Sequence, residues 1–310
     1  MIQVFHSVAA ARNALGSCVV TIGKYDGMHL GHQIILKELK LEASRLKIPA
    51  LVILSEPQPE EFFAGAAAPA RLNAFHDKVA FLGGFGIDAV YCLHFNQETS
   101  RQMPEEFVTQ TLAGLGMRAI VVGEDFRFGR ERMGSIATLQ QLSKPVGFTV
   151  TTVPHCHDSD ERISSTLIRN YLERGDCKRV QECLGRPYAI SGKVVAGRKL
   201  GRQLGFPTAN VQISSNKLPL SGVFVVEADD AGVVRQGVAS IGYNPTVSDA
   251  KQASLEVFLL DFDGDLYDSV LTVNFLHKLR DEHKYSTLAE LQQQMVLDVQ
   301  DARKFFGARQ

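Results

Sequence analysis

Two histidines in a glycine-rich segment are the first residues whose types and spacing point to chemistry. Residues 21–33 read TIGKYDGMHLGHQ, and His29 and His32 stand three positions apart. The apolar run 18–22 predicts a buried strand before this segment, and apolar residues at helical spacing across 35–46 predict a helix after it. A strand, a glycine turn and a helix N-terminus present backbone N–H groups and a positive dipole to a phosphate.

The histidine pair therefore predicts a triphosphate site, because imidazoles at a helix N-terminus stabilise charge that develops on phosphates. The loop residues Gly23, Asp26 and Gly31 belong to the same predicted phosphate site. A solvated surface pair and half of a metal site are the alternatives for an isolated His-x-x-His. The preceding strand and the two glycines favour phosphate binding over both.

A second polar segment follows a predicted strand at residues 119–122. Residues 123–129 read GEDFRFG and offer a carboxylate at Asp125, a cation at Arg127 and an aromatic ring at Phe128. Adenine or a flavin ring can stack on such aromatics, and the arginine can meet a phosphate. A packed turn with an exposed arginine explains this segment equally well.

A third segment, ISSTLIR at residues 163–169, predicts the start of a helix. Serine and threonine are natural N-caps, so Ser165 and Thr166 have a structural role at a helix start. The same N–H groups and hydroxyls can also hold a phosphate, with Arg169 one turn further along. The two interpretations are compatible.

The second half of the chain has its own glycine-rich cluster, GRKLGRQLGFPTAN at residues 197–210. Glycines that include Gly197 and Gly205, together with Arg202 and two neighbouring cations, suit a loop that closes over phosphates, although such loops are also common as solvated turns. Thr208 and Asn210 are two apart, so in an extended segment both side chains point the same way, as magnesium ligands would.

A single carboxylate interrupts the apolar run LEVFLL at residues 255–260. Strand alternation puts Glu256 on the face opposite Leu255, where it is either solvated or available as a base that takes a proton from an alcohol.

Repeated strand and helix patterns up to residue 184 predict a parallel sheet covered by helices on both faces, with ligands at the carboxyl ends of its strands. Two of the expected helices have apolar spacing from Leu72 to Leu82 and a start at Pro104. β-rich segments with turns follow residue 188 and predict a small antiparallel sheet or barrel, and an amphipathic helix over 287–306 is expected to pack against it. The predicted domains are 1–184 and 185–310.

Composition limits the classes of function. The chain has 310 residues, 45% hydrophobic and 22% charged, which suits two globular domains. A formal net charge of −1 argues against a nucleic-acid partner. Five scattered cysteines without a CxxC predict free thiols in a reducing compartment. We find neither a signal peptide nor a membrane-spanning apolar run, so we expect a cytoplasmic protein without a membrane partner. The oligomeric state is not fixed by these features.

These segments, in this order, resemble the bacterial bifunctional riboflavin kinase/FAD synthetase family along nearly the whole chain. The resemblance rests on GKYDGMHLGHQ, GEDFRFG, ISSTLIRNYLERGD, LGRPY and GRQLGFPTAN. The His-x-Gly-His motif is shared with other nucleotidyltransferases and class I aminoacyl-tRNA synthetases, whereas FPTAN in a β-rich domain is more specific. The resemblance implies an α/β plus β fold, in which a Rossmann-like HxGH nucleotidyltransferase domain precedes a small antiparallel β-barrel with a C-terminal helix.

The resemblance also implies two ATP-dependent steps. The C-terminal domain would phosphorylate riboflavin to FMN, and the N-terminal domain would transfer AMP to FMN, giving FAD and pyrophosphate. In the kinase, it implies Glu256 as the base, Thr208 and Asn210 as holders of Mg²⁺ with ATP, and Arg280 near the flavin. Gly197, Arg202 and Gly205 would form the loop over ATP.

In the adenylyltransferase, the resemblance implies that His29 and His32 stabilise the reacting phosphates. Ser165, Thr166 and Arg169 would hold the triphosphate, and Asp125 and the neighbouring aromatics would line the nucleotide or flavin pocket. Two other functions stay open at this point. One is a nucleotidyltransferase for another phosphate ester, and the other is a flavin-binding regulator without catalysis.

Overall fold

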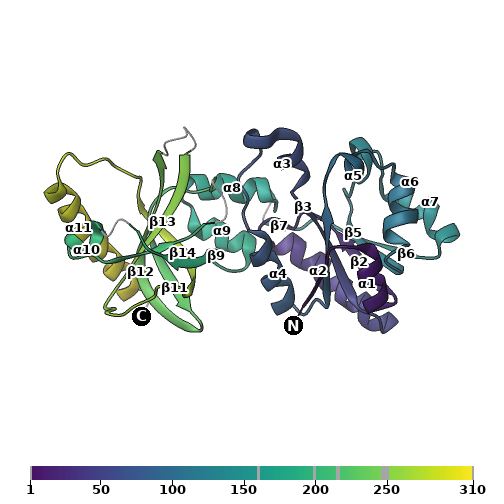
Figure 1. The fold of residues 1–310 in the computed structure, drawn as a ribbon, viewed down its shortest axis with the longest axis horizontal. Helices are drawn as coiled ribbons and strands as arrows, with labels where there is room; N and C mark the ends of the chain where they lie inside the picture. The colour runs from purple at the N-terminus through teal and green to yellow at the C-terminus, as the bar shows by residue number, and fades with distance from the viewer. Residues whose placement is uncertain (1, 159–160, 198–199, 214–216, 246–250, 309–310) are drawn as a thin grey trace. The chain divides into compact units, whose positions relative to one another are not determined.

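The computed structural model describes residues 2–158, 161–197, 200–213, 217–245 and 251–308. Contacts between Cα atoms divide the chain into two compact units. The first holds residues 1–69 and 75–164, and the second holds residues 70–74 and 165–310. Figure 1 shows the helices and strands of both units.

The first unit is built around a six-stranded sheet of order β1-β4-β3-β2-β5-β6, in which every pairing is parallel. Its strands are β1 (Gln3–Phe5), β2 (Cys18–Ile22), β3 (Ala50–Glu56), β4 (Ala89–His94), β5 (Met117–Gly123) and β6 (Thr149–Val153). The predicted parallel sheet is confirmed. Because β5 pairs with β2 on the side away from β3, the strand order reverses between β2 and β5, where sheets of this kind bind ligands.

Helices cover both faces of this sheet (Figure 1). They are α1 (Val8–Leu15), α2 (Leu30–Leu46), α3 (Pro59–Ala64), α4 (Phe75–Gly84), α5 (Gln97–Arg101), α6 (Pro104–Glu106) and α7 (Ile136–Val146). Two short 3₁₀ turns (Gly65–Ala67 and Arg130–Arg132), a π-helical segment (Phe107–Leu112) and a hairpin of β7 (His157–Asp158) and β8 (Glu161–Arg162) complete the unit.

Side chains point alternately to the two faces along each strand, so each face of the sheet packs into its own apolar core. Val20 and Ile120 belong to the cluster that includes residues of α1 and α7, whereas Val19 and Val121 belong to the cluster that includes residues of α2 and α4. A strand buried on both faces reads as a continuous apolar run, which is why β2 and β5 could be recognised in the sequence.

Two helix predictions differ from the structure. The helix expected from Leu72 begins only at Phe75, although Leu72 is buried at 2% exposure. Leu72 is apolar because it is buried before the helix begins, and not because it lies on the buried face of the helix. The helix expected at Pro104 starts there but continues as the π-helical segment at 107–112.

The second unit is a closed antiparallel barrel of order β10-β13-β12-β11-β14-β9, closed by the pairing of β9 with β10. Its strands are β9 (Tyr188–Val195), β10 (Thr208–Val211), β11 (Gly222–Asp230), β12 (Val233–Pro245), β13 (Lys251–Leu259) and β14 (Val270–Arg280). Its helices are α8 (Ser165–Arg174), α9 (Cys177–Leu184), α10 (Leu200–Gln203) and α11 (Leu288–Gly307). The predicted barrel and C-terminal helix are confirmed.

Helix α11 lies against the outside of the barrel (Figure 1). Ala302 and Phe306 are buried with Val223 and Val225 of β11. Residues of the opposite strand face, such as Phe224 and Leu255, are fully buried and fill the barrel interior. Among the described residues, no helix is both long and apolar enough to span a bilayer.

Candidate active sites

The loop between β2 and α2 has an unusual backbone. Tyr25 and Met28 both adopt a φ of 48°, and Gly27 has a φ of 90°. A left-handed conformation costs a non-glycine residue about 1–2 kcal/mol. Tyr25 and Met28 are only 2% and 1% exposed, so their burial in the core offsets that cost. The loop is thereby held in one shape at the carboxyl end of β2.

His29 caps the N-terminus of α2. Its Nδ1 accepts a hydrogen bond from the backbone N–H of His32 at 3.3 Å, and the two imidazole rings stack with centroids 3.6 Å apart. Burial, and then the positive charge of Arg162, lowers the pKa of His29 to about 4. The ring is therefore neutral at pH 7, and because its Nδ1 accepts, its proton lies on Nε2. That N–H is a hydrogen-bond donor suited to a phosphate oxygen.

His32 is also neutral at pH 7, since burial, followed by the charges of His29, Lys78 and Lys24, lowers its pKa well below the usual range. Its Nδ1 is buried and has no hydrogen-bond partner within the described part of the chain. An unpaired buried polar atom is costly unless a bound group satisfies it. The structure thus brings both predicted histidines together as the sequence indicated.

Gly31 has a steric reason to be glycine. A Cβ at this position would lie 3.2 Å from the ring of His29 and 3.5 Å from the Cβ of Cys156. Gly23 is similarly close to Tyr25, whose ring would be 3.0 Å from an added Cβ. Asp26 is buried at 1% exposure within the same loop. These three predicted loop residues therefore shape the site around the histidines.

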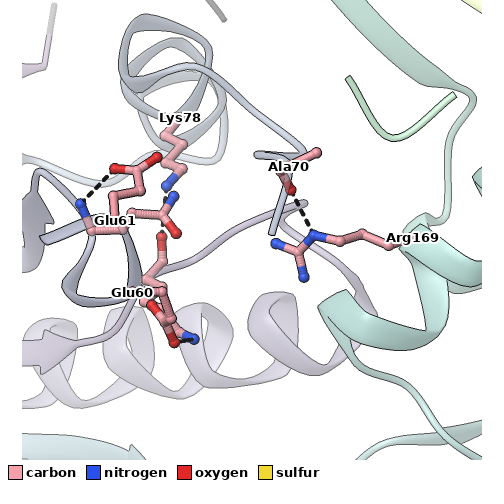
Figure 2. Close-up of polar contacts among 7 residues, drawn as sticks. Glu60, Glu61, Ala70, Lys78 and Arg169 are labelled. Carbon is pink, nitrogen blue, oxygen red and sulfur yellow. Dashed lines mark hydrogen bonds and ion pairs between the residues drawn. The ribbon is translucent and has the colours of Figure 1, made fainter. Parts of the chain in front are cut away.

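A buried lysine, which the sequence analysis missed, holds this loop in place. Lys78 of α4 is 2% exposed, and its Nζ donates a hydrogen bond to the carbonyl oxygen of Lys24 at 2.9 Å. The Lys24 ammonium in turn pairs with Glu60, while Glu61 accepts a hydrogen bond from the backbone N–H of Gln58 (Figure 2). The only signal in the sequence was a lysine at a helical position among apolar residues.

The segment after β5 lies beside the end of β6, as the sheet order requires. Asp125 pairs with Arg162 at 2.6 Å, and His155 lies 3.5 Å from Glu124 and 4.0 Å from Asp125. Burial opposes ionisation of Asp125, but the hydrogen bond and charge of Arg162 outweigh it and lower the pKa of this carboxyl. Arg162, which also acts on His29, is a second site residue that the sequence analysis missed.

The other two residues predicted in this segment differ in exposure. Arg127 is exposed, whereas Phe128 is 6% exposed and belongs to the core. Its ring lies 5.5 Å from Phe126 and 5.9 Å from Phe107. The packed-turn interpretation therefore describes Phe128, and a flavin-binding role for Arg127 and Phe128 stays a prediction.

The predicted phosphate residues near 165 open a helix, as expected. Ser165 and Thr166 begin α8, and Arg169 donates from Nε to the carbonyl oxygen of Ala70 at 2.6 Å (Figure 2). All of them belong to the second compact unit. A role for these residues beside His29 stays a prediction.

A cavity of about 370 Å³ lies on the outer face of the barrel beneath α11. Strands, the glycine-rich segment and α11 all contribute to its lining: Gly197, Gly201, Leu204, Phe206, Thr208, Asn210, Val223, Val238, Ser240, Ser254, Glu256, Phe258, Arg280, Leu291, Met295, Asp298 and Val299. Five predicted site residues meet there, although they are spread over more than 80 positions of the chain. This volume is in the range of small-molecule sites.

The register of two barrel strands sets the polar centre of the cavity. Asn210 of β10 stands opposite Glu256 of β13, and Thr208 stands opposite Phe258. Alternation keeps Thr208 and Asn210 on one face, where the Thr208 hydroxyl donates to Oε2 of Glu256 at 3.2 Å. Glu256 thus lies in a half-buried cavity and not on an open surface, and three oxygen-bearing side chains converge there.

The glycine-rich segment closes one side of this cavity. Gly197 lines it, Arg202 is exposed, and Gly205 has a φ of 86° in an exposed turn. The neighbouring cations Arg198 and Lys199 lie outside the described residues. That this segment forms a loop over ATP stays a prediction.

If this cavity is the riboflavin kinase site that the family resemblance implies, enlarging Gly197 should damage riboflavin phosphorylation alone. A Cβ there would lie 2.2 Å from Nδ2 of Asn210, so the amide must move in Gly197→Ala. Displaced supporting groups typically cost 10- to 100-fold in activity, and we expect a loss of about that size in FMN formation. Separate assays of riboflavin phosphorylation and FMN adenylylation measure it. Gly307→Ala, where nothing lies within 4 Å, is the control. Full kinase activity in Gly197→Ala would contradict the prediction.

Comparison with known proteins assigns a family to each part of the chain. A family model described as FAD synthetase matches residues 11–167, and one described as riboflavin kinase matches residues 184–306. A bifunctional riboflavin kinase/FMN adenylyltransferase from Pseudomonas fluorescens is 46% identical to this chain, over 92% of both chains. One from Haemophilus influenzae is 39% identical, over 99% of this chain and 100% of the relative.

A solved structure shares the whole architecture. A crystal structure named as a macrolide-efflux protein from Streptococcus pneumoniae is 27% identical, with a TM-score of 0.82, over 97% of this chain and 99% of that one. Both domain families and the full-length relatives agree on one assignment. The chain belongs to the family of bifunctional riboflavin kinase/FMN adenylyltransferases.

Proposed function

We propose that the two sites divide the two reactions between residues 1–184 and 185–310. The cavity under α11 phosphorylates riboflavin, and the loop around His29 adenylylates FMN. The observation that carries the proposal is the convergence of Thr208, Asn210 and Glu256 in one cavity, in a unit other than that of the histidines. The first family match ends at residue 167 and the second begins at residue 184, which supports a boundary near residue 184.

In the kinase cavity, Glu256 takes the proton of the ribityl 5′-hydroxyl as that oxygen bonds to the γ-phosphorus of ATP and ADP leaves. The hydroxyl of Thr208 and the amide oxygen of Asn210, next to a carboxylate, form the hard oxygen donor set that Mg²⁺ prefers. These two residues would hold Mg²⁺ with ATP, and the bound ion would neutralise phosphate charge. The remaining task of the protein is to position the two substrates.

In the adenylyltransferase site, a phosphate oxygen of FMN bonds to the α-phosphorus of a second ATP as the bond to pyrophosphate breaks. The neutral imidazoles donate N–H groups to phosphate oxygens as negative charge shifts to the leaving group. The N-terminus of α2 adds its dipole at the same place. Ser165, Thr166 and Arg169 hold the triphosphate, and Asp125 with its neighbours lines the pocket.

An exposed aromatic cluster offers a place for the flavin ring of FMN. Phe62 and Phe63 of α3 and Phe95, just after β4, have ring centroids 5.2–5.9 Å apart. Phe63 is 70% exposed, which is rare for a large apolar side chain in a cluster and marks an interaction site. The cluster follows the carboxyl ends of β3 and β4, the edge of the sheet that carries the histidine loop.

Removal of one exposed ring tests this flavin position. Phe63→Ala is expected to raise the KM for FMN by about three- to tenfold in adenylylation, since an aromatic stacking contact contributes about 0.5–1.5 kcal/mol. The kinase step should keep its riboflavin KM. Tyr267→Ala, a change at an exposed aromatic of the barrel unit, is the control. An unchanged FMN KM in Phe63→Ala would place the flavin elsewhere, for example near Arg127.

A product assay tests the function as a whole. Incubation of the protein with riboflavin and MgATP, followed by chromatography, should yield FMN and then FAD and pyrophosphate. Adenylylation of another phosphate ester without any FMN or FAD would favour the alternative nucleotidyltransferase. Flavin binding with no product would favour a regulator.

We further propose that the enzyme works in the cytoplasm with ATP and flavins as its small-molecule partners. All five cysteines lie outside disulfides in the structure, and four of them are buried. Burial raises the pKa of Cys18 to about 12 and that of Cys177 to about 11, which keeps these thiols unreactive. A reducing compartment suits such a set.

A further inference from the structure

A buried carboxylate on α11 faces the kinase cavity and has no part in the chemistry described so far. Asp298 is 6% exposed and lines the cavity together with Arg280. Its Oδ1 accepts from Nε of Arg280 at 2.8 Å, and its Oδ2 accepts from Nη2 at 2.8 Å. Gln294, one turn earlier in the helix, donates to Oδ1 at 3.0 Å.

The pair fixes the guanidinium of Arg280 in one plane. Two parallel hydrogen bonds to a carboxylate restrict both the position and the tilt of the group, which a single bond would not. Nη1 of Arg280 also donates to the carbonyl oxygen of Asp281 at 3.1 Å, and the guanidinium carbon lies 5.8 Å from the ring centroid of Tyr285. The hydrogen bond that Arg280 donates to Asp298 raises the pKa of Arg280, so the cation is permanent.

These contacts leave donor capacity for a bound molecule. An arginine has five N–H groups, and the protein contacts of the described residues occupy three of those in Arg280. Because Arg280 ends β14 and lines the cavity, its remaining N–H groups are available to acceptor atoms of a substrate there. The carbonyl oxygens and ring nitrogens of a flavin are such acceptors.

Apolar contacts also attach the helix to the barrel. Ala302 and Phe306 of α11 are buried with residues of β11, one to two turns beyond Asp298. Apolar contacts of this kind bind a helix as well as a buried ion pair does, and replacing such a pair by apolar residues is often neutral or stabilising. A carboxylate at position 298 therefore has a use in orientation beyond the packing of the helix.

We propose that Asp298 is a positioning residue for the kinase step, which holds Arg280 in the orientation that binds the flavin ring of riboflavin. The inference rests on the proposed kinase function of the cavity. It assigns to the C-terminal helix a part in flavin recognition that acts through Arg280. Asp298 itself does not need to touch the substrate.

The test is a steady-state comparison of Asp298→Asn with the full-length wild-type enzyme. The substitution keeps the size of the side chain but removes its charge and one acceptor. We expect the KM for riboflavin to rise about tenfold, the effect of losing about 1.4 kcal/mol of binding. We expect kcat and the KM for ATP to stay within about twofold, because the change acts through flavin orientation. Adenylylation of supplied FMN should not change.

A double-mutant cycle separates positioning from general destabilisation. If Asp298 acts only through Arg280, the pair Asp298→Asn with Arg280→Lys raises the riboflavin KM no more than the worse single change. Asp301→Asn, on the same helix and paired with Lys304 at an exposed site, is the matched control and should leave every constant unchanged. The assignment would be overturned if the increases in riboflavin KM caused by the two changes multiplied in the double variant. It would also be overturned if Asp298→Asn left the riboflavin KM unchanged.

A second variant covers the case in which Asp298→Asn does not fold, as judged by thermal unfolding. Asp298→Glu keeps the buried charge and shifts the guanidinium by one methylene, so a rise in the riboflavin KM at unchanged kcat is again expected, and an unchanged KM again overturns the assignment. A wild-type enzyme that forms no FMN would instead overturn the proposed function together with this assignment. The two failures are therefore distinct.

Discussion

Glu256→Gln is expected to abolish FMN formation from riboflavin while FMN is still converted to FAD. Glutamine keeps the length of the side chain and can still accept the hydrogen bond from the Thr208 hydroxyl, but it cannot take a proton. Loss of a general base typically lowers the rate by about 10²–10⁴-fold. The two steps are measured separately, with riboflavin and then with FMN as the supplied substrate.

Glu227→Gln is a matched control for the kinase prediction. Glu227 stands on β11 of the same barrel, opposite Gln236 and Asn274, and does not line the cavity. Its substitution should leave both steps intact. Loss of both steps in Glu256→Gln would show that the sites are not independent, and unimpaired FMN formation would remove Glu256 from the role of base.

The complementary result is expected for His29, where substitution by Ala should stop FAD formation and let FMN accumulate. Ala removes both the cap of α2 and the Nε2 donor. Loss of one preorganised donor to developing charge typically costs about 10²–10³-fold in rate. The measurement is the time course of FMN and FAD from riboflavin and MgATP.

Asn at position 29 separates the two functions of the histidine. His29→Asn retains an N-cap acceptor, so it should recover helix stability but not adenylylation. His6→Ala, at an exposed position, should behave as wild type. Undiminished FAD synthesis in His29→Ala would contradict the role of this histidine.

Acid unfolding provides an independent check on the environment of His29. Its pKa is about 4 in the folded protein and 6.5 in an exposed state. Between these values the unfolded chain binds the extra proton, so the fold loses stability as the pH falls from about 6.5 towards 4. His29→Asn removes this contribution, and its stability, measured by denaturant unfolding at several pH values, should vary less over that interval.

Much of the local structure could be predicted because it depends on neighbouring residues. The helix that begins at Ser165 was expected from the serine and threonine residues around its start, and the strand at 18–22 was expected from an apolar run. The shared face of Thr208 and Asn210 follows from strand alternation. Apolar spacing failed at Leu72, because burial by distant residues produces the same pattern as a helix face.

The residues that support the sites could not be predicted, since their partners are distant in sequence. Lys78 meets the backbone of Lys24 across 54 positions, and Arg162 meets Asp125 across 37. The residue type alone does not distinguish a solvated lysine or arginine from one that is buried beside a carbonyl oxygen. The sequence of the amphipathic helix does not distinguish Asp298 from its solvated polar neighbours. Only the packing of the helix on the barrel shows that Asp298 is buried.

The sequence by itself determined the chemical groups and their local presentation: two histidines at a helix start, a hydroxyl and an amide on one strand face, and a single carboxylate in an apolar strand. Tertiary structure decided which groups meet. Pairing of β10 with β13 brought Glu256 to Thr208, and the reversal of strand order placed the ends of β2 and β5 side by side. Strand pairing between distant segments depends on the packing of whole faces, so no short stretch of sequence carries that information.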